Sequence, residues 1–151
     1  MRALLAAACI AALTACGGTS APIGGADREW IANTSGVIDE LERDLAFAAS
    51  GGDNVGAARR ALRDESSLYT ILVAYTDFGG CRHMVAAAGE PPARFAAAER
   101  SLGSACALLE RAAALFTRAS TEHDAQALVA AGRATQQASP FLLRAKAELT
   151  P

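Results

Sequence analysis

The side chains best suited to chemistry lie close together between Tyr75 and Met84. Cys81, His83 and Met84 fall within four residues there, and all three side chains are ligands for soft or borderline metals such as copper and zinc. A zinc site, however, needs three or four ligands at recognisable spacing, and the other histidine of the chain is the distant His123. We therefore predict no metal site and no cofactor, and keep a metal or redox protein as the third-ranked alternative.

Motifs for the common catalytic mechanisms are missing from the sequence. It has no Gly-x-Ser-x-Gly nucleophile elbow, no His-Glu-x-x-His and no Cys-x-x-Cys-His haem attachment sequence. Asp77-Phe78-Gly79 spells the metal-binding tripeptide of protein kinases, but the Gly-rich nucleotide loop and the catalytic-loop Asp that give it this role are missing. We interpret the tripeptide as a helix break and predict that the protein is not an enzyme.

The N-terminal segment carries the most specific pattern in the chain. Arg2 is followed by the apolar run Ala3–Leu13, which ends on Leu13-Thr14-Ala15-Cys16. A positive start, a short apolar stretch and small residues before a cut site are the features of an export signal. The ending resembles the lipobox of bacterial lipoproteins. This resemblance implies that residues 1–15 are a signal peptide, that Cys16 is acylated with diacylglycerol and palmitate, and that the mature protein is anchored in the cell membrane or envelope on the extracytoplasmic side.

Two other interpretations of this segment stay open. One is an uncleaved transmembrane span, although about eleven apolar residues cover roughly 16 Å as a helix, half of a bilayer's hydrocarbon core. The other is a plain secretory signal cut after Ala15, which would leave an unmodified cysteine at the new N-terminus.

The remaining cysteines are assigned from the lipobox. Cys9 leaves with the signal peptide and Cys16 takes the lipid, so Cys81 and Cys106 remain in a compartment where disulfides persist. We predict a Cys81–Cys106 bridge, whose loop of about 25 residues would stabilise the fold by about 3.5 kcal/mol in the chain-entropy model. The alternative is two unrelated buried thiols.

Composition indicates a helical domain that does not bind nucleic acid. The formal net charge is −2 at pH 7, and losing Arg2 with the signal peptide makes it −3, so there is no basic excess for a phosphate backbone. Alanine, leucine, arginine and glutamate are abundant, which favours α-helix. Residues 16–26, in contrast, are mostly Gly, Ser, Thr and Pro, which is typical of a flexible tether.

Apolar residues at three- and four-residue spacing predict an all-α domain of residues 27–151, folded as an up-down four-helix bundle. The predicted helices span about 27–49, 54–88, 92–119 and 122–149; the second is broken at Gly79-Gly80, and the fourth is kinked or restarted at Pro140.

Three local features refine this prediction. The run Leu68–Tyr75 is apolar on every side, and we expect a helix that is the most buried of the set rather than a strand, because no second strand-like run could pair with it. Thr121 and Asp124 have the spacing of a capping box for the last helix. Asp44 is expected on the solvent side of the first helix, together with its acidic neighbours.

The leading hypothesis for function is a lipid-anchored helical module that acts through protein–protein contact in the cell envelope, with the membrane and an envelope protein as partners. The second hypothesis is a binder of a small apolar or lipid-like ligand between the helices. Candidate contacts are the aromatic and polar side chains around the glycine pair, namely Tyr69, Tyr75, Asp77, Phe78, Arg82 and His83.

Overall fold

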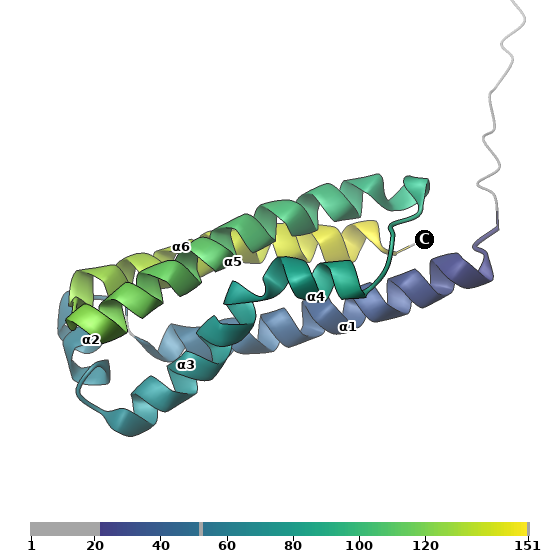
Figure 1. Cartoon of the computed structure of the whole chain (residues 1–151). Helices are drawn as coiled ribbons and strands as arrows, with labels where there is room; N and C mark the ends of the chain where they lie inside the picture. The colour runs from purple at the N-terminus through teal and green to yellow at the C-terminus, as the bar shows by residue number, and fades with distance from the viewer. Residues whose placement is uncertain (1–21, 52, 151) are drawn as a thin grey trace, which may run out of the picture.

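The computed structural model describes residues 22–51 and 53–150, which form six α-helices and two short 3-10 helices and contain no β-strand (Figure 1). The predicted all-α fold class is therefore confirmed. The predicted signal peptide, Cys16 and the tether as far as residue 21 lie outside the described residues. The elements are α1 (Gly25–Ala48), η1 (Ala49–Gly51), α2 (Val55–Ala61), α3 (Glu65–Gly79), α4 (Cys81–Ala87), η2 (Ala93–Phe95), α5 (Ala96–Glu122) and α6 (Ala125–Glu148).

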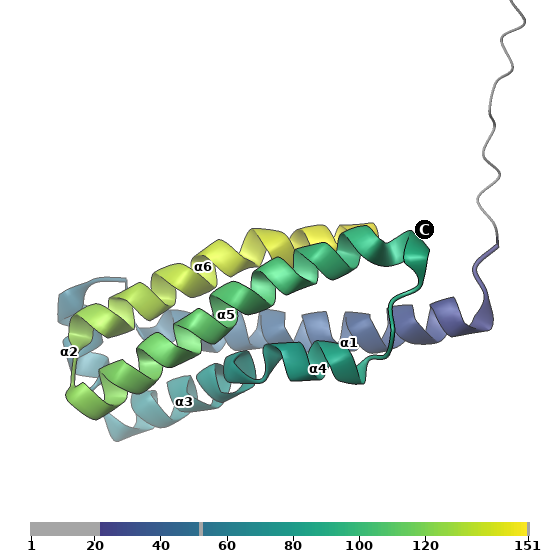
Figure 2. The same cartoon turned by 45° about the horizontal axis from the view of Figure 1, so that its top comes forward.

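The six α-helices pack together around one apolar core. Helices α5 and α6 lie side by side in both views and share the most extensive contact (Figures 1 and 2). Helix α1 contacts α3 and α6, and α3 also contacts α5. The start of α1 and the C-terminus lie at one end of the molecule, whereas α2 and the start of α3 lie at the other (Figure 1). The largest fully buried apolar side chains include Ile38, Leu41, Ile71, Phe78, Leu102, Leu109, Leu128 and Leu142.

Helix α1 begins two residues earlier than predicted. The Gly24 N–H donates to the Asp27 carboxylate at 2.9 Å, which satisfies an N–H group that the helix itself cannot pair. Gly25 and Ala26, which we had assigned to the flexible tether, therefore belong to the first helical turn.

The predicted second helix, about 54–88, is three helices, because the chain breaks after Ala61 as well as at Gly79-Gly80. Helix α2 ends at Ala61, and α3 begins after Asp64, whose carboxylate accepts a hydrogen bond from the Ser67 N–H at 3.1 Å. The Asp64 side chain and the Ser67 backbone form a cap that starts a new helix in place of a continuous one. The apolar spacing on either side of this cap does not reveal the break. The break at Gly79-Gly80 is confirmed, because α3 ends at Gly79 and α4 starts at Cys81.

The junction before the last helix differs from the prediction. Thr121 lies inside α5 and donates back to the Thr117 carbonyl at 2.9 Å, so it is not a cap. His123 ends α5 in the left-handed conformation at φ 54°, and Asp124 alone caps α6, accepting from the N–H of Gln126 at 2.9 Å. Helix α6 starts at Ala125 instead of Glu122 and runs through Pro140 as one helix, so no restart occurs there.

Candidate functional site

The predicted disulfide is present. Cys81 and Cys106 are bonded at 2.05 Å, which joins the first residue of α4 to the middle of α5, and both side chains are buried. This bond uses one of the sulfur ligands of the third-ranked metal hypothesis, while His83 is exposed on α4. Within the described parts of the chain, no three His, Cys, Asp or Glu side chains are grouped so that they could hold a metal ion.

Tyr75 and Phe78 are core residues. The Tyr75 ring stacks on Phe116 of α5 with ring centroids 4.6 Å apart, and it meets the edge of Phe78 at 5.3 Å. Tyr75 is 2 % exposed, and its hydroxyl has no hydrogen-bond partner among the described residues. Burial raises the pKa of this hydroxyl to about 12. These ring contacts place Tyr75 and Phe78 in the hydrophobic core.

The other four candidate contacts are not part of the core that contains Tyr75 and Phe78. Arg82 is exposed on α4 and pairs with Glu110 of α5 at 3.1 Å, which is a surface interaction of small energetic value. His83 lies on the same short helix and is exposed. Tyr69 is on the outside of α3, and Asp77 faces α1. The six predicted contacts are therefore distributed over the core and separate surfaces and do not form one site.

Four residues form an apolar stripe on the outer face of α3, and we name it the α3 outer stripe: Tyr69, Leu72, Val73 and Thr76. Their spacing of three, four and seven residues puts them on one side of the helix, opposite the side that carries the buried Ile71, Ala74 and Phe78. Tyr69 is 70 % exposed, and Leu72 and Val73 are each close to half exposed. The prediction that this helix is the most buried of the set is thus wrong, because α3 is covered on one side only.

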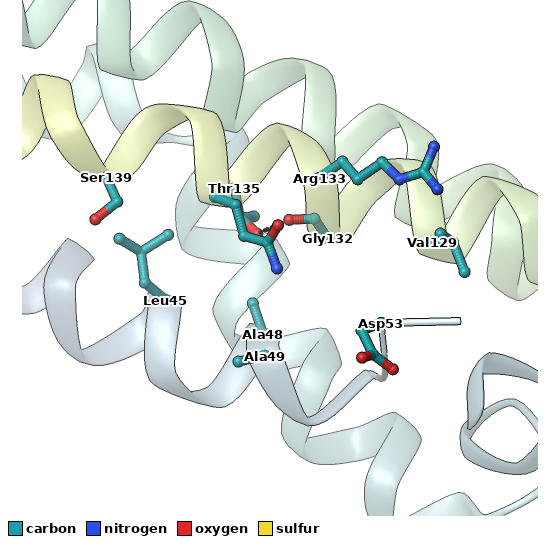
Figure 3. A pocket seen from close by; sticks show the side chains of 10 residues that line it. Leu45, Ala48, Ala49, Asp53, Val129, Gly132, Arg133, Thr135 and Ser139 are labelled. Carbon is teal, nitrogen blue, oxygen red and sulfur yellow. Dashed lines mark hydrogen bonds between the residues drawn. The ribbon is translucent and has the colours of Figure 1, made fainter. Parts of the chain in front are cut away.

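A cleft of about 270 Å³ lies between α6 and the end of α1 (Figure 3). Leu45 and Ala48 of α1 and Val129 of α6 supply apolar walls, and Thr135 and Ser139 of α6 supply hydroxyl groups. A space of this size and mixed polarity suits a small ligand that carries a few hydrogen-bonding groups. The remaining lining residues are Ala49, Asp53, Gly132, Arg133 and Gln136.

Sequence reasoning missed this cleft. Abundant alanine lets helices approach closely, which favours a closed interior over a cleft. In this cleft, however, Ala48 and Ala49 lie across from Gly132 (Figure 3), and residues this small leave a gap between the helices. The only signal in the sequence was the polar cluster Thr135-Gln136-Gln137 beside the apolar stripe of the last helix.

A buried acid lies at the contact between α1 and α3. Asp44 is 5 % exposed, so its predicted place on the solvent side of the first helix is wrong. Its burial, repulsion from Asp77 of α3 and the hydrogen bond between the two carboxyls raise the pKa of Asp44 to about 6; Glu40 adds to the rise and Arg43 opposes it. The spacing in the sequence indicates that Asp44 lies on the buried side of α1. It is three residues after Leu41 and four before Ala48, and both of these are buried.

None of the helices in the described part of the chain is both long and apolar enough to cross a bilayer.

Comparison of the chain with protein-family models, with curated proteins and with solved structures finds no match to any of them.

Proposed function

We propose that this protein is a lipid-anchored, extracytoplasmic helical module of the cell envelope that binds a partner protein through the α3 outer stripe. The observation that carries the proposal is the exposure of three large apolar side chains, Tyr69, Leu72 and Val73, at helical spacing on a helix whose other side is in the core. Scattered exposed apolar residues are ordinary, whereas an aligned set marks a contact surface.

The chemistry of the stripe favours another helix as its contact. Residues at this spacing form the seam into which an amphipathic helix packs, and no charged side chain lies among residues 66–76 of α3 to oppose such packing. Burying a side chain the size of Leu or Val is worth about 1.5–3 kcal/mol when the burial is complete, so a few of these contacts supply a useful affinity.

The arrangement of helices would suit this role. In our proposal α1, α3 with α4, α5 and α6 are the four rods of an up-down bundle, and their alternating directions keep the connections short. Such a bundle would hold α3 rigidly between its neighbours, so that the stripe loses little conformational freedom when a partner binds.

The anchor sets the orientation in the same proposal. Cys16 would hold the lipid, and eight residues separate it from Gly25 at the start of α1. Helix α1 has 24 residues and is therefore about 36 Å long. Because α3 begins at the end of the molecule away from the start of α1 (Figure 1), the stripe would face other envelope proteins in preference to the bilayer.

Site-specific photo-crosslinking in intact cells tests this function. A photoreactive amino acid in place of Leu72 should give a discrete adduct of defined mass, and the same probe in place of the exposed Gln137 of α6 should not. Adding Val73→Asp, which changes an exposed side chain, should abolish the adduct, and palmitate should label the chain but not its Cys16→Ser variant. Adducts that are the same at both positions, or that survive Val73→Asp, would rule out the stripe as the contact.

The α1–α6 cleft supports a second candidate function, binding of a small, partly apolar ligand. Ala49→Phe should fill the cleft from its exposed rim, whereas Ala46→Phe adds the same ring to an exposed position of α1 that does not line it. Native mass spectrometry of protein recovered from its own cells should show a bound small molecule in the wild type and in Ala46→Phe, and not in Ala49→Phe. Apo mass in all three proteins would exclude this candidate.

A further inference from the structure

The contact between α1 and α3 contains three acids and one base. Asp44 is buried on α1, and Asp77 of α3 is half-buried and within hydrogen-bonding reach of it. Glu40, one turn earlier on α1, adds negative charge, and among the described residues Arg43 is the cation that acts on Asp44. The Asp44 Oδ2 atom is buried and has no hydrogen-bond partner in the described structure. Among the described residues, the charged groups that act on this carboxyl belong to α1 and α3.

Two carboxylates in this position oppose the packing of the helices that carry them. When both are ionised they repel across a contact that water does not fully screen, and neither can donate a hydrogen bond to the other. One added proton changes the interaction, because a carboxylic acid donates to a carboxylate in a short, charge-assisted hydrogen bond. The same pair therefore repels when both groups are charged and binds when a single proton is shared.

We propose that Asp44 and Asp77 form a proton-operated clasp that fastens α3 to α1 in mildly acidic conditions and loosens it at neutral pH. The clasp affects the helix that carries the α3 outer stripe, because Val73 and Thr76 lie within about one turn of Asp77 on the same helix. It does not depend on the lipid anchor or on a partner protein, and it can be tested when neither is present.

The direction of the pH effect follows from proton binding. The pKa of Asp44 is about 6 in the folded protein, above its ordinary value of 3.8. Between these values the folded state binds more protons than the unfolded state, so the folded state gains stability as the pH falls from 7 towards 4. Most small proteins lose stability over this range as their paired carboxylates are protonated.

Thermal unfolding of the full chain between pH 7.5 and pH 4.5 tests the clasp. The wild-type Tm should rise by several degrees on acidification, starting near pH 6 and continuing to rise down to pH 4.5. Asp44→Asn should raise the Tm at pH 7.5 and flatten the rise, because the amide donates to Asp77 at every pH. Glu29→Gln, which removes an exposed acid of the same helix, should keep the wild-type profile. A wild-type Tm that falls from pH 7.5 to pH 5, or a full rise in Asp44→Asn, would overturn the proposal.

Hydrogen exchange separates a local clasp from a general effect of acid. After correction for the intrinsic exchange rate, the amides of α3 should exchange more slowly at pH 5.5 than at pH 7.5, and those of α5 and α6 should change little. Asp77→Asn, at a half-buried position that tolerates the change more easily than Asp44, should remove this difference. Equal changes in all helices, or a difference that persists in Asp77→Asn, would contradict the assignment to this pair.

Discussion

Buried polar groups without partners are the informative single residues in this protein. Tyr75 and Asp44 each bury an oxygen atom that has no hydrogen bond in the described part of the structure, but the consequences differ. The Tyr75 hydroxyl is neutral at every physiological pH, because its pKa is about 12, so its burial involves only a lost hydrogen bond. Asp44 can carry a charge near neutral pH, and its burial makes the α1–α3 contact depend on protons.

Replacing Tyr75 by Phe tests the unpaired hydroxyl. We expect the free energy of unfolding to stay level or to rise by about 1 kcal/mol, because the variant keeps both ring contacts and removes a donor that is buried without a partner. Phe116→Ala, which deletes the stacked ring instead, should lower it by about 3–5 kcal/mol. Urea denaturation followed by circular dichroism measures both. A loss of more than about 1 kcal/mol in Tyr75→Phe would mean that the hydroxyl makes a bond in solution.

At the level of the helices, apolar periodicity identified the stripes but not where the helices end. The run from Val55 to Phe78 keeps its apolar spacing through the point where α2 stops and α3 starts, so the spacing alone predicted one helix. The break depends on Asp64, whose side chain caps the new helix through the Ser67 N–H. The capped break and a continuous helix differ only a little in free energy, so tertiary packing decides which of the two forms.

The sequence also did not show which faces of a helix would be buried. The apolar run in α3 predicted a helix surrounded by others, yet the fold covers only the side that carries Ile71 and Phe78. Composition reports how apolar a helix is, but only the arrangement of its neighbours determines which of its faces is left in solvent. Only the packing of the neighbouring helices shows that the α3 outer stripe, which carries the proposed function, is left exposed.

For the whole molecule, the disulfide connects parts that the packing leaves weakly joined. Helix α4 is short, and its contact with α5 is small compared with the contact between α5 and α6. The bond between Cys81 and Cys106 holds α4 in place and closes a loop across the turn at Gly89, where φ is +101°. The sulfur atoms are buried, so the bond should resist reduction until the protein unfolds.

Replacing both cysteines by Ser tests this contribution. The double variant should lose about 3–4 kcal/mol of unfolding free energy, since its unfolded chain regains the freedom of a loop of 25 residues. Urea denaturation of the variant and of the wild type, each with and without reductant, makes the comparison. The wild type under reducing conditions should unfold at the same urea concentration as the variant. Equal stability of the oxidised wild type and the variant would show that the bridge contributes nothing.

The sequence by itself determined the properties that depend on local pattern and on the chemistry of single side chains. The helical class follows from composition and spacing, and the break at Gly79-Gly80 follows from the poor helix propensity of glycine. The Cys81–Cys106 pairing was predicted by counting the cysteines that remain once Cys9 and Cys16 are assigned to the predicted signal peptide and its lipid. Each of these needs only residues that are near one another or a short list of alternatives.

The tertiary structure alone decided which groups meet across helices. Asp44 and Asp77 are 33 residues apart in sequence, and the cleft joins the end of α1 to the middle of α6. Neither contact follows from local spacing, because the spacing shows which side of a helix is apolar but not which helix packs against it. The physical reason is that local rules fix which side of a helix is apolar, whereas packing fixes which neighbour each residue touches and how much solvent remains between them.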